Sequence, residues 1–181
     1  ALPHFLRRLV AGTCTGGGLA CCRPRLSTKE NDFQHRRGGF RGRAEEKGIA
    51  IVNLIGFPEW AVPEQDRRAK GFAEAARCFE LARELGCPHV AAPPFGIHDR
   101  KVELRPVVQR FAELVDLAAE SGVSPLLEYW GIAKTLGTTG ETLLVAAECG
   151  RPGVQMLADV FHMYKGSGHH CGFEHFGAGR L

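Results

Sequence analysis

The sequence lacks long apolar runs and the common nucleotide-binding glycine motifs. No run of roughly 18 uninterrupted apolar residues occurs in its 181 residues, so no membrane-spanning helix is expected. Its 23 glycines follow no fixed period, which excludes a collagen-like repeat. Neither G-x-G-x-x-G nor G-x-x-x-x-G-K-S/T follows a predicted strand, so neither dinucleotide-binding nor P-loop chemistry is indicated.

Cysteine usage argues against a disulfide framework. The chain contains seven cysteines, an odd number, of which Cys21 and Cys22 are adjacent and the others are scattered. Small secreted scaffolds usually carry an even set, so we expect a reducing, cytoplasmic compartment. The remaining composition, with 44% hydrophobic and 24% charged residues, is typical of one globular domain.

Charge divides the chain into two parts. Residues 1–47 contain ten Lys and Arg against four Asp and Glu, whereas residues 48–181 contain thirteen against sixteen. The first part has glycine clusters and no sustained apolar period, so we expect a basic, disordered or non-native extension at 1–43. A nucleic-acid-binding arm, an organelle-targeting segment and an export signal ending near Cys21 are alternative interpretations. Because the sequence opens on Ala1, we expect its true start to lie elsewhere.

Residues 44–181 are predicted to form a domain of alternating strands and helices. Short apolar runs predict the strands, and apolar residues at three- and four-residue steps predict the helices between them. Pro63 and Gly86 bound the first helix, and a capping box at Thr138 opens the third. The predicted strands are 49–55, 88–92, 123–128 and 154–159, and the predicted helices are 63–86, 106–122 and 138–150. The first strand is expected to be buried on both faces.

This alternation predicts a parallel sheet, either doubly wound or part of an eight-stranded barrel. The third and fourth strands end in carboxylates, Glu128 and Asp159, and His162 follows three residues later. Strand ends in a barrel converge on one face, so these residues are a candidate divalent-metal site. The ordinary alternative for such an acid is a solvated loop residue or a helix cap. Both acids end apolar runs, where an unpaired buried charge is costly, and this favours the metal site.

Four segments carry a resemblance to a known family. They are V-N-L-I-G-F-P-E-W at 52–60, A-R-E-L-G-C-P-H-V-A-A-P-P at 82–94, L-L-E at 126–128 and D-V-F-H at 159–162. In this order and spacing they resemble the xylose isomerase-like TIM barrel superfamily, and within it the sugar phosphate isomerase/epimerase branch. The resemblance covers about residues 44–176, equivalent to the third to sixth of the family's eight strands.

The resemblance implies a metal-dependent isomerisation or epimerisation of a small sugar, sugar phosphate or keto acid. In that chemistry, proton abstraction next to a carbonyl gives a metal-stabilised enediolate. It implies that Glu128 and Asp159 ligate Mn²⁺, Mg²⁺, Co²⁺ or Zn²⁺ and that Glu128 is also a catalytic base. His162, the second catalytic candidate, would contact substrate oxygens.

The resemblance also suggests residues that would surround the substrate. Family members often wall the sugar with aromatic residues near strand ends, for which Trp60 and Trp130 are the candidates, with ordinary packing as the alternative. Lys165 is a candidate contact for a substrate phosphate. The expected partner is therefore a small carbohydrate or keto acid.

The chain departs from the family at both ends. The family's strand-seven histidine and strand-eight glutamate have no counterpart before Leu181, and residues 1–43 do not show the first two units. We therefore expect an α/β fold that is a partial TIM barrel of parallel strands, truncated at both ends, unless copies of the chain associate to complete a barrel. His169, His170 and Cys171 are possible substitute ligands, with a solvated loop as the alternative.

Two other functions stay open at the level of the sequence. The missing strand-eight glutamate favours an inactive, or merely metal- or sugar-binding, barrel fragment. An apurinic-site endonuclease-like zinc phosphodiesterase would need histidines at earlier strand ends, where this chain has Phe57 and Phe95, with His98 slightly further on. The negative balance of residues 48–181 also disfavours nucleic acid as a partner. No membrane contact is expected, and a homo-oligomer is an option.

Overall fold

The computed structural model describes residues 39–168 of the chain. Most of the predicted extension, residues 1–38, lies outside this range, as do the possible substitute ligands His169, His170 and Cys171. The predicted boundary between an extension and a domain therefore stays a prediction.

One part of the predicted extension is ordered. Residues 39–46 are helical, although poor order is expected up to residue 43. Ala44 is buried and Phe40 packs against the hydrophobic core, and these tertiary contacts stabilise a segment whose own apolar pattern is weak.

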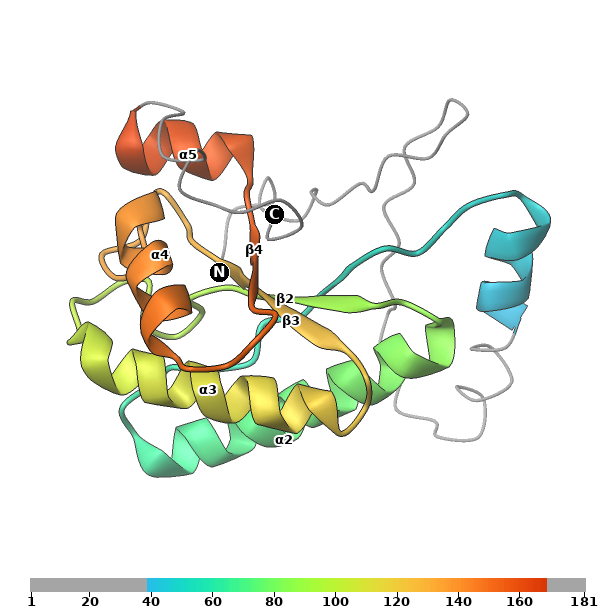
Figure 1. Ribbon diagram of the computed structural model, residues 1–181, viewed down its shortest axis with the longest axis horizontal. Helices are drawn as coiled ribbons and strands as arrows, with labels where there is room; N and C mark the ends of the chain where they lie inside the picture. The colour runs from blue at the N-terminus through green and yellow to red at the C-terminus, as the bar shows by residue number, and fades with distance from the viewer. Residues whose placement is uncertain (1–38, 169–181) are drawn as a thin grey trace.

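From residue 54 onward, strands and helices alternate as predicted (Figure 1). In chain order the elements are β1 (Leu54–Ile55), α2 (Gln65–Leu85), β2 (His89–Ala92), α3 (Leu104–Ala119), β3 (Ser124–Glu128), α4 (Thr139–Glu148), β4 (Gln155–Leu157) and α5 (Val160–Ser167). The predicted α/β class is confirmed, and α5 is an addition that the sequence pattern did not indicate. No helix among the described residues has the length and apolarity needed to cross a membrane.

The strands form one parallel sheet in the order β1-β2-β3-β4, so each strand pairs with the next strand of the chain. Leu54 lies opposite Val90, and Leu127 lies opposite Met156. All four side chains are buried in one hydrophobic core with residues of α2 and α3, which run side by side along the sheet (Figure 1). Since the strands are parallel, their carboxyl ends share one edge of the sheet, and Glu128 lies at this edge.

The first strand is shorter and more exposed than predicted. β1 contains only Leu54 and Ile55 of the predicted 49–55, and Ile55 is 38% exposed while Val52 is 37% exposed. Burial on both faces is therefore wrong for this strand. β1 is an edge strand of the described sheet, paired with β2 on one side, so its apolar side chains are only partly covered.

Helix ends follow local signals with small shifts. Thr138 caps α4 by accepting a hydrogen bond from the Glu141 amide, as the capping box predicts. Gly86 ends α2 in the left-handed conformation, with φ of 67°, which glycine adopts without steric cost. Helix α3 begins at Leu104, so Pro106 lies in its first turn, where a missing amide hydrogen costs nothing.

Candidate metal centre

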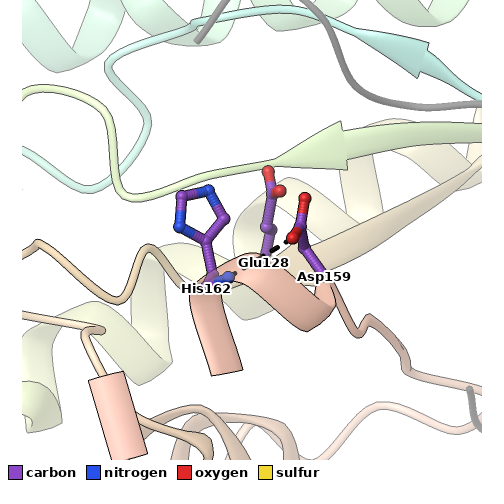
Figure 2. Close-up of side chains that lie close together, drawn as sticks. All are labelled: Glu128, Asp159 and His162. Carbon is purple, nitrogen blue, oxygen red and sulfur yellow. Dashed lines mark hydrogen bonds between the residues drawn. The ribbon is translucent and has the colours of Figure 1, made fainter. Parts of the chain in front are cut away.

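The predicted carboxylates and histidine meet at the carboxyl edge of the sheet. Glu128 is the last residue of β3, Asp159 follows the end of β4 by two residues, and His162 lies in the first turn of α5. One potential ligand atom from each residue lies within 4.8 Å of the other two. In Figure 2 the two carboxylates lie side by side and point the same way, with the imidazole ring next to them.

Asp159 also caps the following helix. Its Oδ1 atom accepts hydrogen bonds from the Phe161 amide at 2.7 Å and the His162 amide at 3.3 Å, and this fixes the start of α5. The capping alternative from the sequence is thus correct, and it is compatible with the metal site. The cap uses Oδ1, so the same carboxylate can present its second oxygen to a cation.

Glu128 is a buried acid with a strongly altered affinity for its proton. The residue is 5% exposed. Burial, and secondarily the nearby charge of Asp159, raise the pKa of Glu128 to about 8, while hydrogen bonding with the Trp130 side chain lowers it. A buried carboxylate with a half-buried one within 4.8 Å fits a divalent cation, because the cation would offset both their repulsion and their loss of hydration.

His162 is held by the backbone of a neighbouring loop. Its Nδ1 atom accepts a hydrogen bond from the Gly131 amide at 3.2 Å, and the side chain is buried. Burial lowers the pKa of His162, with Asp159 acting in the opposite direction, so the neutral form is favoured. Because Nδ1 is the acceptor, the neutral ring carries its hydrogen on Nε2. That ring is suited to donate a hydrogen bond to a substrate oxygen rather than to ligate the metal.

We expect nitrogen-15 NMR of the metal-free protein at pH 8 to show His162 as the Nε2–H tautomer. His89 is an internal control with the opposite expectation, because its Nδ1 lies 3.0 Å from the carbonyl oxygen of Val52 and must donate to it. The variant His162→Gln assigns the signal. An Nδ1–H tautomer at His162 would contradict the Gly131 contact.

Trp130 lies beside the candidate site, and its predicted role in walling the substrate stays a prediction. Its ring centroid lies 6.2 Å from that of His162, in a stacked arrangement. Phe57, Phe95 and His98 surround the other edges of the indole, with centroids at 6.1, 6.4 and 5.4 Å. The sequence pattern did not identify Phe57 and Phe95 as neighbours of Trp130, although both follow strand ends at the edge that carries Glu128.

Trp60 and Lys165 are placed differently from Trp130. Trp60 is fully buried, its indole nitrogen donates to the Pro93 carbonyl oxygen at 2.8 Å, and its ring packs on Phe111 of α3. Core packing thus accounts for Trp60, and the structure does not bring it to the three clustered residues. Lys165 lies exposed in the last turn of α5.

Comparison with known proteins agrees with this architecture. A sequence model of the family described as xylose isomerase-like TIM barrel matches residues 18–180. No curated protein matches the chain. Three similar solved structures are the IolI protein with a bound zinc atom, L-ribulose 3-epimerase, and the 3-keto-D-glucoside 4-epimerase YcjR of E. coli.

The structural similarity is consistent across the three proteins. The IolI protein has a TM-score of 0.65 and 20% identity, covering 75% of this chain and 50% of its own. L-ribulose 3-epimerase has a TM-score of 0.60 and 22% identity, covering 69% of this chain and 46% of its own. YcjR has a TM-score of 0.60 and 17% identity, covering 71% of this chain and 55% of its own. At these identities the comparisons establish a shared fold, and the chain spans about half the length of these structures.

Proposed function

The chain belongs to the xylose isomerase-like TIM barrel family, and from this membership we propose that it takes part in divalent-metal-dependent isomerisation or epimerisation of a small sugar, sugar phosphate or keto acid. The observation that carries the proposal is the cluster of Glu128, Asp159 and His162 at the carboxyl edge of the sheet. Sugar epimerases and a zinc-bound protein among the similar structures support it.

Glu128 and Asp159 would hold the cation, which would be Mn²⁺, Mg²⁺, Co²⁺ or Zn²⁺. When bound, the cation would polarise the substrate carbonyl and stabilise the negative charge that proton removal leaves on its oxygens. Such ions take roughly four to six ligands, so further groups would complete the coordination. The described residues supply two of them as carboxylates from neighbouring strand ends.

Glu128, His162 and the neighbouring Trp130 have distinct tasks in the proposed reaction. Glu128 takes a proton from the carbon next to the substrate carbonyl and returns it, a task for which a bound cation would keep the carboxylate ionised. His162 donates its Nε2–H to a substrate oxygen, with the Gly131 amide holding the ring. Trp130 shields this region from water with an apolar surface.

The test is solvent hydrogen exchange. We expect the protein with Mn²⁺ or Co²⁺ to incorporate deuterium from D₂O next to the carbonyl of at least one ketose, aldose or keto acid in a panel. Glu128→Gln should lower that rate by at least about a hundredfold, since general acid–base catalysis contributes roughly 10²–10⁴-fold. Glu120→Gln, an exposed carboxylate after α3, is the matched control and should retain the parental rate.

Two results would count against this function. Absence of exchange with every cation and substrate would favour a metal- or sugar-binding fragment without turnover. Exchange that survives Glu128→Gln would show that another group moves the proton.

A further inference from the structure

Trp130 belongs to a loop that is bonded to the neighbouring loop along the sheet edge. The β3–α4 loop (129–138) follows Glu128, and the β2–α3 loop (93–103) follows β2. The Lys134 amide donates to the His98 carbonyl oxygen at 2.8 Å, so the two backbones are in direct contact. These loops therefore form one wall beside the candidate metal centre.

Thr135 makes the central connection between the two loops. Its hydroxyl donates to the Arg100 carbonyl oxygen at 2.7 Å and accepts from the Val102 amide at 2.9 Å. The residue is fully buried, so water does not compete for these backbone groups. One side chain thus satisfies a donor and an acceptor on the opposite loop.

The connection continues from Thr135 to Trp130 through the adjacent residue. The Leu136 carbonyl oxygen accepts a hydrogen bond from the Trp130 amide at 3.0 Å. Leu136 is fully buried and has φ of 54°, a left-handed conformation that a branched side chain rarely adopts. Such a backbone persists when its surroundings hold it, and the Thr135 hydrogen bonds lie directly beside it.

We propose that Thr135 is a positioning residue that holds Trp130 against Glu128 and His162 by fixing the β3–α4 loop to the β2–α3 loop. The hydroxyl of Thr135 bonds to the backbone of Arg100 and Val102, so its influence on the cluster passes through Leu136 and Trp130. The effect on Trp130 is independent of the proposed function, whereas the effect on cation binding rests on it.

Thr142 provides a matched control. It is also a fully buried threonine, and its hydroxyl donates to the Thr138 carbonyl oxygen at 3.0 Å. That bond lies within the first turn of α4 and makes no connection to the β2–α3 loop. Loss of stability from a missing buried hydroxyl is therefore common to both threonines, whereas displacement of Trp130 is expected from Thr135 alone.

The experiment compares Thr135→Val, Thr135→Ser and Thr142→Val in metal-free protein by proton–nitrogen NMR. The chain has two tryptophans and hence two indole signals, and Trp130→Phe identifies the one from Trp130. We expect Thr135→Val to shift the Trp130 signal, Thr135→Ser to restore it, and Thr142→Val to leave it unchanged although its melting temperature falls. Thr135→Ala removes the same hydrogen bonds without adding a methyl group against Arg100, and it replaces the valine variant if that variant does not fold.

A second measurement is the dissociation constant for Mn²⁺. We expect Thr135→Val to weaken binding by about tenfold, the lower range for outer residues that orient metal ligands, and Thr142→Val to retain the parental value. An unchanged Trp130 signal in Thr135→Val, or an equal shift in Thr142→Val, would overturn the proposal. If the parent binds no Mn²⁺, the proposed metal function fails, and the indole signals still decide the role of Thr135.

Discussion

Without divalent cations, we expect Glu128→Gln to have a higher free energy of unfolding than the parent protein at pH 8, and so to be more stable. Burial and the neighbouring Asp159 raise the pKa of Glu128 to about 8, from an ordinary value of 4.5. Each unit of difference corresponds to about 1.4 kcal/mol, so ionising this carboxyl in the folded protein costs several kcal/mol. Glutamine keeps the shape and carries no charge, and we expect it to stabilise the protein by at least about 2 kcal/mol.

This difference should depend on pH with a defined sign. Between about pH 4.5 and 8 the folded protein keeps the proton on Glu128 while the unfolded chain releases it, so this group's contribution to stability is lost as pH rises. His162 acts in the other direction, because burial lowers its pKa and its contribution is lost as pH falls below about 6.5. Subtracting the parent's free energy of unfolding from that of Glu128→Gln leaves mainly the contribution of Glu128. This difference should grow by up to about 1.4 kcal/mol for each unit that the pH rises within that range.

A divalent cation should narrow the difference in stability between the two proteins. A ligand that binds only the folded state, at 100 times its dissociation constant, adds roughly 2.7 kcal/mol. Glu128→Gln lacks the anionic oxygen and should gain little, so the advantage of the variant should shrink by about 2.7 kcal/mol in Mn²⁺ at 100 times its dissociation constant. Urea unfolding followed by circular dichroism, in EDTA and in Mn²⁺ from pH 5 to 8.5, measures both effects.

The exposed substitution Glu120→Gln is the control for this series and should give curves that run parallel to those of the parent. A metal-free Glu128→Gln protein that is less stable than the parent at pH 8 would show that the carboxylate already has a compensating partner. Equal stabilisation of parent and variant by Mn²⁺ would place the cation elsewhere.

The order of the elements could be predicted because it depends on local signals. The capping box at Thr138, the glycine at Gly86 and the short apolar runs between helices each act within a few residues of the chain. The two acids could be predicted for the same reason. An acid that ends a buried strand lies at the carboxyl edge of a parallel sheet, so Glu128 and Asp159 had to lie close together once their strands paired.

The features that could not be predicted from the sequence depend on contacts between residues that lie far apart in the chain. Trp60 and Trp130 both follow strand ends, yet Trp60 packs on Phe111 in the core and Trp130 packs on His162. The orientation of the His162 ring depends on the Gly131 amide, 31 residues earlier in the chain. Residue type and spacing do not tell which of the two tryptophans packs against a helix. They also do not tell which ring nitrogen of His162 accepts the hydrogen bond from a backbone amide.

The close packing of α5 against the β3–α4 loop leads to a second large effect. A Cβ atom built on Gly166 would overlap the Gly137 carbonyl oxygen and lie 3.0 Å from the Gly131 Cα atom. Both neighbours are backbone, so neither can rotate out of the way. Gly166→Ala is therefore expected to destabilise the protein by about 3 kcal/mol, within the range for overpacked sites, and to lower the melting temperature by roughly 10 °C.

Gly140→Ala separates this steric effect from the ordinary effect of glycine in a helix. Gly140 also lies in a helix, α4, and a Cβ atom there would meet nothing within 4 Å. Alanine at that position should stabilise the protein by about 0.5 kcal/mol, because it reduces the freedom of the unfolded chain. The two substitutions are chemically identical, so opposite signs in thermal unfolding would isolate the contact between α5 and the loop.

The same substitution should also disturb the candidate site. Moving α5 away from the loop separates the Nδ1 atom of His162 from the Gly131 amide that donates a hydrogen bond to it. We therefore expect Gly166→Ala to lose the single Nε2–H tautomer of His162, whereas Gly140→Ala should retain it. A Gly166→Ala protein with parental stability and an unchanged His162 signal would show that the helix can shift along the loop at little cost, and that the tautomer is set by something other than this packing.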